Sequence, residues 1–277
     1  MSKLNLCEMF ASDYPIIGVI HLLPLPGSPT WQGNMLQIIE RAEQEAIALQ
    51  TGGVNGIIIE NFFDTPFTKG RVDTATVSAL TLVISHLQAV CNIPIGLNVL
   101  RNDALTAIAI AYVTGLKFIR VNVLSGVMAT DQGIIESIAY DLHMYKRQLT
   151  CTAQILDLKI FADVMVKHAS PIGADQDLLF SAKDTAYRGL ADAIILSGKA
   201  TGDSPNINEA KLLHEHLPDT PLLLGSGVTH ANIKNFMDST NGIIVASSLK
   251  RFGKLENPVD VDKVRSLVSI VNAKVTS

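Results

Sequence analysis

Residues 222–250 read LLLGSGVTHANIKNFMDSTNGIIVASSLK, and this stretch contains the pattern that decides the fold. A short aliphatic run ends in small residues, a segment with helical spacing follows, and a second aliphatic run again ends in small residues. Aliphatic runs without polar alternation are typical of parallel strands that are covered on both faces. The stretch therefore predicts two consecutive β/α units.

The same unit recurs along the whole chain. The aliphatic runs predicted as strands are 16–21, 56–60, 95–99, 118–123, 160–166, 193–196, 222–225 and 242–246. The segments predicted as helices are 35–50, 74–90, 103–113, 132–148, 176–188, 208–216, 230–236 and 259–273. Such runs also fit a doubly wound sheet, but eight strands with a helix after each predict an α/β fold, a (β/α)8 TIM barrel of the ribulose-phosphate-binding kind.

A single domain is expected over residues 1–277, with an N-terminal extension at 1–14 and a closing helix and tail at 259–277. A barrel of this kind needs about 250 residues for one core. The composition is 48% hydrophobic and 17% charged, with a mean hydropathy of +0.29, which indicates a well-buried protein. Apolar surface left over from the core favours a homo-oligomer.

The net charge and the cysteine spacing limit which kinds of partner and which cellular compartment are expected. The net charge is −4 and the pI about 6.0, so no basic field exists to bind nucleic acid. Cys7, Cys91 and Cys151 have neither disulfide-framework nor zinc-site spacing, which fits a reducing, cytoplasmic compartment. No apolar run approaches the roughly 20 residues that span a bilayer, and residues 1–14 lack a signal-peptide core. Any membrane contact is therefore expected to be peripheral.

The long connections are 22–34, 61–73, 124–131, 167–175 and 197–206, and each follows a strand. This asymmetry places the elaborated loops at the carboxyl ends of the strands, where barrel enzymes have their sites. The small residues after the last two strands predict a phosphate site there, because backbone amides can approach an anion closely. The predicted phosphate-binding residues are Gly225, Ser226, Gly227, Ser247 and Ser248. The alternative is that they only form tight turns.

Polar side chains also stand at the other strand ends, where a carboxylate beside a lysine or histidine can act as acid or base. The candidate catalytic residues are His21, Glu60, Asn61, Asp64, Asn98, Arg101, Arg120, Asn122, Asp163, Lys167 and His168. For each of them a structural hydrogen bond or ion pair at the barrel rim is the alternative. Alternation along the strand turns Arg120 and Asn122 inward, and Asp163 is the nearest inward acid. An interior Arg120 is therefore expected either to pair with Asp163 or to bind an anion.

No cofactor or metal is expected. His21, Glu60, Asp64 and His168 lack metal-site spacing, since none of them stands in a His-x-His or His-Glu-x-x-His motif. A Gly-x-Gly-x-x-Gly motif after the first strand is absent, which argues against dinucleotide binding. A Gly-x-Ser-x-Gly elbow is absent as well, which argues against an α/β-hydrolase nucleophile.

The connection after the first strand, HLLPLPGSPTWQGN at residues 21–34, contains the only tryptophan. Its prolines stiffen the chain, and a rigid apolar loop serves either as a lid over a pocket or as a contact surface for a partner. Trp31, with Pro24 and Pro26, is the predicted partner contact, because tryptophan is a frequent interface anchor. Packing of Trp31 under its own loop is the alternative.

Seven blocks in order resemble the BtpA family from end to end. They are HLLPLPGSP (21–29), GIIIENFFDTPF (56–67), IPIGLNVLRND (93–103), KFIRVNVLSGVMATDQG (117–133), ADVMVKHASPIG (162–173), ADAIILSGKATGDSP (191–205) and PLLLGSGVT (221–229).

The resemblance to the cyanobacterial branch implies a photosystem I biogenesis factor, needed for the stability and accumulation of the reaction-centre proteins. It implies the photosystem I core or its assembly machinery as partner, and peripheral association with the cytoplasmic side of the thylakoid membrane. Relatives outside photosynthetic organisms imply an alternative, a barrel enzyme or sensor acting on a phosphorylated small molecule, either a sugar phosphate or a nucleotide. The family supplies no established catalytic residues.

Overall fold

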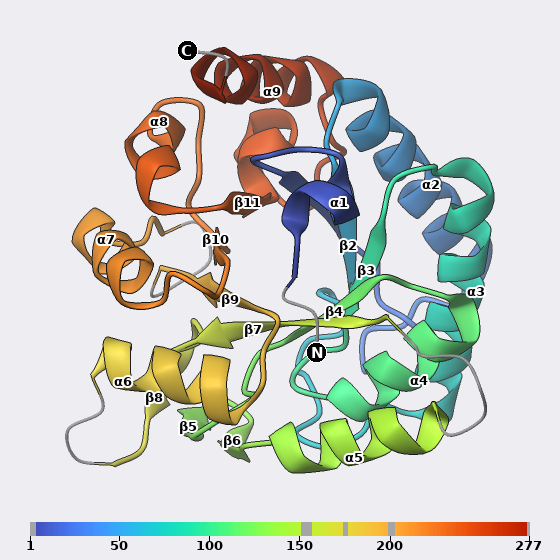
Figure 1. The fold of residues 1–277 in the computed structure, drawn as a ribbon. Coiled ribbons are helices and arrows are strands. Elements are labelled where there is room, and N and C mark those ends of the chain that lie inside the picture. The colour runs from blue at the N-terminus through green and yellow to red at the C-terminus, as the bar shows by residue number, and fades with distance from the viewer. Residues whose placement is uncertain (1–3, 151–156, 174–176, 199–202, 276–277) are drawn as a thin grey trace.

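Eight parallel strands close into a barrel in the computed structural model, which describes residues 4–150, 157–173, 177–198 and 203–275 (Figure 1). The barrel strands are β1 (Ile16–His21), β2 (Gly56–Glu60), β3 (Ile95–Asn98), β4 (Phe118–Val121), β7 (Lys159–Val164), β9 (Ala193–Leu196), β10 (Leu222–Leu224) and β11 (Gly242–Val245). Their order around the barrel follows the chain, and β11 pairs with β1 through Ile16 and Ile243. The predicted (β/α)8 barrel is confirmed.

Helices cover the outside of the barrel (Figure 1). They are α2 (Met35–Gly52), α3 (Thr74–Val90), α4 (Ala104–Thr114), α5 (Ala139–Leu149), α6 (Leu178–Lys183) with a π-helical turn at Asp184–Arg188, α7 (Ile207–His216), α8 (Ile233–Phe236) and α9 (Val261–Val275). Shorter 3₁₀ turns lie at Met237–Ser239, Ser247–Leu249 and Arg251–Gly253. Within the described part of the chain, no helix combines the length and the apolar character that crossing a bilayer requires.

Alternation along the strands separates two layers of core. Outward side chains such as Ile119 and Val121 pack between barrel and helices, while inward Phe118 and Phe161 fill the barrel. Gly96 makes room for this filling, since a Cβ there would lie 2.3 Å from the Phe118 ring. Side chains that face inward nearer the carboxyl ends are polar. The barrel therefore has an apolar floor beneath a polar layer.

A short helix closes the amino end of the barrel. Residues 1–14 were predicted only as an extension, but Leu6–Phe10 form helix α1, capped by the Asn5 side chain. Phe10 is buried and meets the Phe118 ring edge-on, with the ring centroids 5.5 Å apart. The aromatic contact explains why α1 is held against this end of the barrel.

The predicted helix over 132–148 is wrong in its first part. Residues Gly133–Glu136 form strand β6, which pairs in antiparallel fashion with β5 (Val127–Thr130), and β5 pairs with β8 (Ala169–Pro171). Gly133 adopts φ +99°, which allows the tight reversal between β5 and β6. Met128 and Ile135 then pack on Val123 and Val166. This small sheet lies in two of the connections that follow barrel strands.

Several predicted boundaries also shift, because caps and turns fix them. Asp103 and Asp177 cap the starts of α4 and α6 instead of lying within helices, accepting hydrogen bonds from Thr106 and Phe180. The predicted helix 230–236 shortens to α8, because Asn232 Oδ1 binds the Thr229 amide in a turn. The predicted start of 176–188 lies outside the described residues.

Candidate functional site

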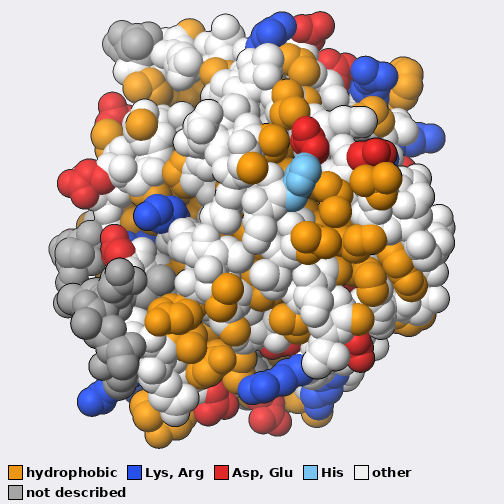
Figure 2. Space-filling view, turned by 90° about the vertical axis from the view of Figure 1, so that its right-hand side faces the viewer, with side chains coloured by type: hydrophobic (Ala, Val, Ile, Leu, Met, Phe, Trp, Pro, Cys, Tyr) orange, Lys and Arg blue, Asp and Glu red, His pale blue; other side chains and the backbone are white. Residues whose placement is uncertain are grey.

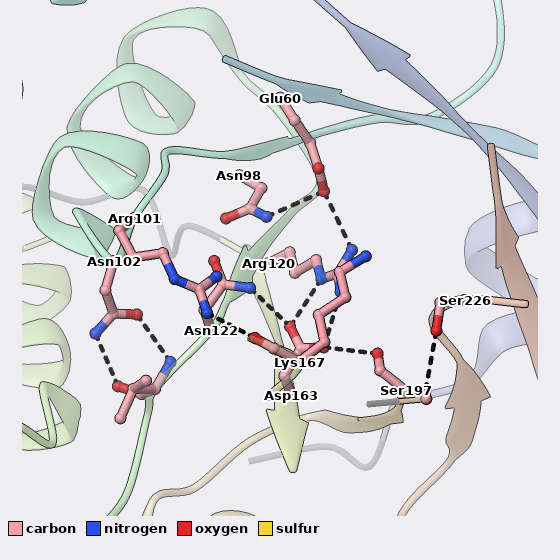
Figure 3. Close-up of polar contacts among 12 residues, drawn as sticks. Glu60, Asn98, Arg101, Asn102, Arg120, Asn122, Asp163, Lys167, Ser197 and Ser226 are labelled. Carbon is pink, nitrogen blue, oxygen red and sulfur yellow. Dashed lines mark hydrogen bonds and ion pairs between the residues drawn. The ribbon is translucent and has the colours of Figure 1, made fainter. Parts of the chain in front are cut away.

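Arg120 stands at the centre of the polar layer, surrounded by side chains from neighbouring strands (Figure 3). Its Nε and Nη2 each donate to one oxygen of Asp163, both at 2.8 Å, and its Nη1 donates to Glu60 Oε1 at 3.1 Å. The predicted Arg120–Asp163 pair is therefore confirmed, with Glu60 as a second partner. A bidentate pair of this kind fixes the guanidinium plane.

Amides and a hydroxyl complete the layer. Asn98 donates to Glu60 Oε1 at 3.0 Å, and Asn122 donates to Asp163 Oδ2 at 3.1 Å. Ser197 Oγ donates to Asp163 Oδ1 at 3.2 Å. Ser197 was not predicted, although its position directly after the strand run 193–196 was a usable signal. The carboxylates thus carry several donors each, as buried charges require.

His21 and Glu60 have different protonation states. Burial lowers the pKa of His21 to about 3, although the Glu60 carboxylate, 3.8 Å from His21 Nε2, opposes this. Burial acts to raise the pKa of Glu60, but Arg120 and His21 outweigh it and hold that pKa below its usual range. Near neutral pH the site therefore contains a neutral imidazole beside an ionised carboxylate, and both are weak bases, because their pKa values lie below the neutral range.

Lys167 extends from the loop after β7 over the polar layer (Figure 3). Its ammonium forms no hydrogen bond or ion pair with any of the residues that the structure describes. Burial lowers the pKa of Lys167, and the nearby Arg120 lowers it further. Lys167 is therefore a candidate proton donor, amine base or anion contact.

Two cavities open beside these groups. The larger, of about 240 Å³, is lined on its polar side by Glu60, Asn98, Arg101, Arg120, Asn122, Asp131, Lys167 and His168, and on its other side by Phe62, Thr65, Phe67 and Leu100. The smaller, of about 30 Å³, reaches Gly225, Ser226, Gly227 and Ser247. Glu60, Arg120 and Lys167 line both. The structure thus brings the predicted acid/base residues beside the predicted phosphate loop.

Within that loop, several residues hold neighbouring loops in place. Ser226 Oγ accepts from the Gly198 amide at 2.9 Å and donates to the Asp203 carbonyl at 3.0 Å, and Ser248 Oγ donates to the Val228 carbonyl at 2.8 Å. A Cβ on Gly227 would lie 2.2 Å from the Asp203 backbone. These contacts support the turn-forming alternative for Ser226 and Ser248, and phosphate binding stays a prediction.

Two other candidate catalytic residues, Asn61 and Asp64, form hydrogen bonds that hold the loops at the barrel rim together. Asp64 accepts the Leu25 amide at 2.7 Å and Asn61 Nδ2 at 2.9 Å, while Asn61 Oδ1 accepts the Leu100 amide at 2.7 Å. These bonds tie the loops after β1, β2 and β3 together. His168 is exposed, with φ +56°. Among the described residues, no group of three histidine, cysteine or acidic side chains is arranged to hold a metal ion.

The proline-rich loop after β1 is fixed on the barrel. Leu25 is fully buried, and Thr76 Oγ1 donates to the Pro26 carbonyl at 2.7 Å. Trp31 is half-buried and packs against the core between barrel and helices, while Pro24 is half-buried as well. Part of the predicted contact surface is thus buried against the chain itself. Contact of this loop with a partner stays a prediction.

The fold and this polar layer define a (β/α)8-barrel protein with a charged site at the carboxyl ends of its strands. The chain belongs to the BtpA family, whose model matches residues 12–273. It is 52% identical to a photosystem I biogenesis protein, BtpA, of a Synechocystis strain, with 96% of this chain and 90% of the relative covered. An uncharacterized Thermococcus kodakarensis protein is 42% identical over 92% of this chain and 94% of the relative. An uncharacterized mitochondrial protein of Caenorhabditis elegans is 29% identical, with 98% of both chains covered.

Solved structures with the same fold share little sequence with this chain. The Thermus thermophilus phosphoribosyl anthranilate isomerase superposes with a TM-score of 0.53 at 11% identity, covering 94% of this chain and 99% of that one. The Streptococcus mutans protein KGPDC superposes with a TM-score of 0.55 at 11% identity, covering 95% of this chain and 99% of that one. At these identities the likeness concerns the barrel alone.

Proposed function

We propose that this chain is a photosystem I biogenesis factor that supports the accumulation of the photosystem I reaction-centre proteins. The observation that carries the proposal is the 52% identity to the Synechocystis photosystem I biogenesis protein over nearly the whole of both chains. The partner is then the photosystem I core or its assembly machinery, reached at the cytoplasmic face of the thylakoid by a peripherally bound barrel.

Surface composition supports a partner contact. Figure 2 faces the flank of the barrel that carries α2 and α3, and hydrophobic side chains form several patches on it. Leu36 on α2 is 64% exposed and Leu82 on α3 is 52% exposed. Apolar area of this kind is typical of surfaces that meet another protein, including a second copy of the same chain.

The test is complementation. This chain is expressed in a Synechocystis strain that lacks its own BtpA protein, and photosystem I is measured by low-temperature fluorescence and by immunoblots of the reaction-centre proteins. Restored photosystem I is the expected result. The control is an equal amount of the chain carrying Phe118→Asp, which places a charge in the barrel floor. Absence of recovery despite a soluble, folded chain would contradict the proposal.

A second candidate function is binding or conversion of a phosphorylated small molecule at the barrel rim. It is favoured by the two adjoining cavities that share Glu60, Arg120 and Lys167, and by relatives in archaea and a nematode, which do not build photosystem I. Glu60 or Lys167 would be the acid or base, and the phosphate would lie against Gly225, Gly227 and Ser247.

A thermal-shift screen against sugar phosphates and nucleotides tests this second candidate. A ligand at a hundred times its Kd stabilises the folded chain by about 2.7 kcal/mol and raises the melting temperature. Ser247→Asp places a carboxylate in the smaller cavity and should abolish the shift. A ligand that stabilises both proteins equally would place binding elsewhere.

A further inference from the structure

We propose that the larger cavity at the barrel rim is a second anion site, in which Arg101 and Lys167 bind a carboxylate or phosphate of a small polyhydroxylated ligand. The inference rests on the second candidate function and deepens it, because it assigns the ligand an anionic group at each end. One group occupies the small cavity beside Ser247, and the other occupies the larger cavity.

The buried charges of the cavity are out of balance. Asp163 and Glu60 are both bound to Arg120, so these three groups together carry one net negative charge. Arg101 and Lys167 add two cations to the same space, which leaves one positive charge in excess, and neither forms an ion pair with any carboxylate of the described chain. Asp131 also lines the cavity, but it is exposed, where solvent screens its charge.

The hydrogen-bonding capacity of these two side chains is largely unused. Arg101 is 5% exposed and donates from Nη2 to the Lys167 carbonyl at 2.7 Å. That bond holds the guanidinium in place and leaves its other N–H groups without an acceptor among the described residues. A buried cation without a counterion is costly, so an anion that enters gains from a charge that is already desolvated. A guanidinium fork with an ammonium beside it matches both carboxylate and phosphate.

The rest of the lining indicates a compact, hydroxylated ligand. A volume of about 240 Å³ has room for a small metabolite and not for a peptide segment or a nucleic-acid strand. Asn98 is 2% exposed, its Nδ2 is bound to Glu60, and its Oδ1 accepts no hydrogen bond from the described residues. A ligand hydroxyl is a suitable donor to that oxygen. The apolar side of the cavity, which includes Phe62, can cover the carbon skeleton.

The two cavities adjoin, because both are lined by Glu60, Arg120 and Lys167. One ligand molecule can therefore extend from the larger cavity into the smaller one. Lys167 then stands between the two anionic groups, where it can contact either. Sugar-acid phosphates and sugar bisphosphates are the two classes with this chemistry, and a monophosphate would fill only one of the two sites.

Calorimetric titration with two matched pairs of compounds tests the inference. Glucose 6-phosphate is compared with 6-phosphogluconate, which adds a carboxylate, and fructose 6-phosphate is compared with fructose 1,6-bisphosphate, which adds a phosphate. At least one doubly anionic compound should bind about tenfold more tightly than its partner. The pair that shows the gain identifies the second anion.

Variants test which residues cause the tighter binding of the doubly anionic compound. Arg101→Gln should remove the tenfold preference while the affinity for the monophosphate changes less than about twofold, because Arg101 lines only the larger cavity. Lys167→Gln should remove the preference and also weaken monophosphate binding, because Lys167 lines both cavities, and Lys167→Arg should keep most of the preference. Arg71→Gln, an exposed arginine outside the cavity, is the control and should change nothing. Circular dichroism and melting temperature verify that each variant is folded.

Each outcome decides something different. Monophosphates that bind as tightly as their doubly anionic partners overturn the second anion site and leave the small-molecule function standing. A preference that persists in both glutamine variants places the second anion elsewhere and also overturns it. Failure of all four compounds to bind wild-type protein overturns the inference together with the sugar-phosphate form of the function beneath it.

Discussion

At the scale of the residue, the polar layer follows from inward positions that carry charges where a barrel usually carries aliphatic side chains. Arg120 can occupy such a position because Asp163 and Glu60 meet its guanidinium on two sides. Removing one partner of a buried pair commonly costs about 3–5 kcal/mol, since the remaining charge is left uncompensated. A fixed field of this kind is the usual setting for altered protonation states at a site.

The folding stability should depend on pH through His21. Its pKa falls from the ordinary 6.5 to about 3 on folding, mainly through burial. The unfolded chain therefore takes up a proton below pH 6.5 that the folded chain does not bind until near pH 3, so stability is lost as the pH falls through this window. Between about pH 7 and pH 5 the loss is about 2 kcal/mol.

Urea denaturation of wild type and His21→Asn at both pH values checks this. The variant should lose about 2 kcal/mol less than wild type over the same interval. Parallel pH dependence of the two proteins would show that the pKa of His21 is the same in the folded and the unfolded chain.

At the scale of the element, the small sheet of β5, β6 and β8 gives the rim a core of its own. Met128, Ile135, Val123 and Val166 form a hydrophobic cluster separate from the barrel core. Because the loops after β4 and β7 both contribute to it, the sheet positions Asp131 and Lys167 relative to each other. A separate cluster can open while the barrel stays folded.

Ile135→Ala should therefore loosen the sheet more than the barrel. Truncating a buried isoleucine costs about 2–5 kcal/mol, and here the loss falls on the local cluster. Amide hydrogen exchange should accelerate over residues 127–136 and 169–171 and stay unchanged in β1 and β2. Ile134→Ala is the matched control, because the neighbouring Ile134 is 48% exposed. Uniform acceleration across the barrel strands would show that the sheet is not a separate unit.

At the scale of the whole molecule, the proposed action at the thylakoid predicts a contact surface on the outside of the barrel. The loop after β1 is the predicted contact, and Trp31 is its half-buried anchor. An aromatic ring at the headgroup level or against a protein partner adds apolar contact without deep insertion.

Trp31→Ala should lower the fraction of the chain that sediments with thylakoid membranes, and a high-salt or carbonate wash should release the wild-type protein. Phe252→Ala is the control, because Phe252 is 88% exposed and lies outside the loop. Equal sedimentation of wild type and Trp31→Ala, with both chains folded, would remove the loop from the contact surface.

The sequence by itself determined the barrel and the positions of its eight strands, and it left the inward Arg120 with two alternatives, a pair with Asp163 or a bound anion. Continuous aliphatic runs and their count carry that information locally, and alternation along a strand shows which side chains face inward. It did not determine the small sheet, because residues 132–138 fit a helical spacing equally well. Gly133–Glu136 instead form a strand, whose Ile135 packs on Val123 and Val166 from two other segments. Nor did it determine that the Ser226 hydroxyl hydrogen-bonds to the backbone of the loop after β9, or that Ser197 binds Asp163. The shared cavity of Arg101 and Lys167 was not determined either. Those contacts join residues that are far apart in the chain, so they exist only once closure of the barrel brings the strand ends together.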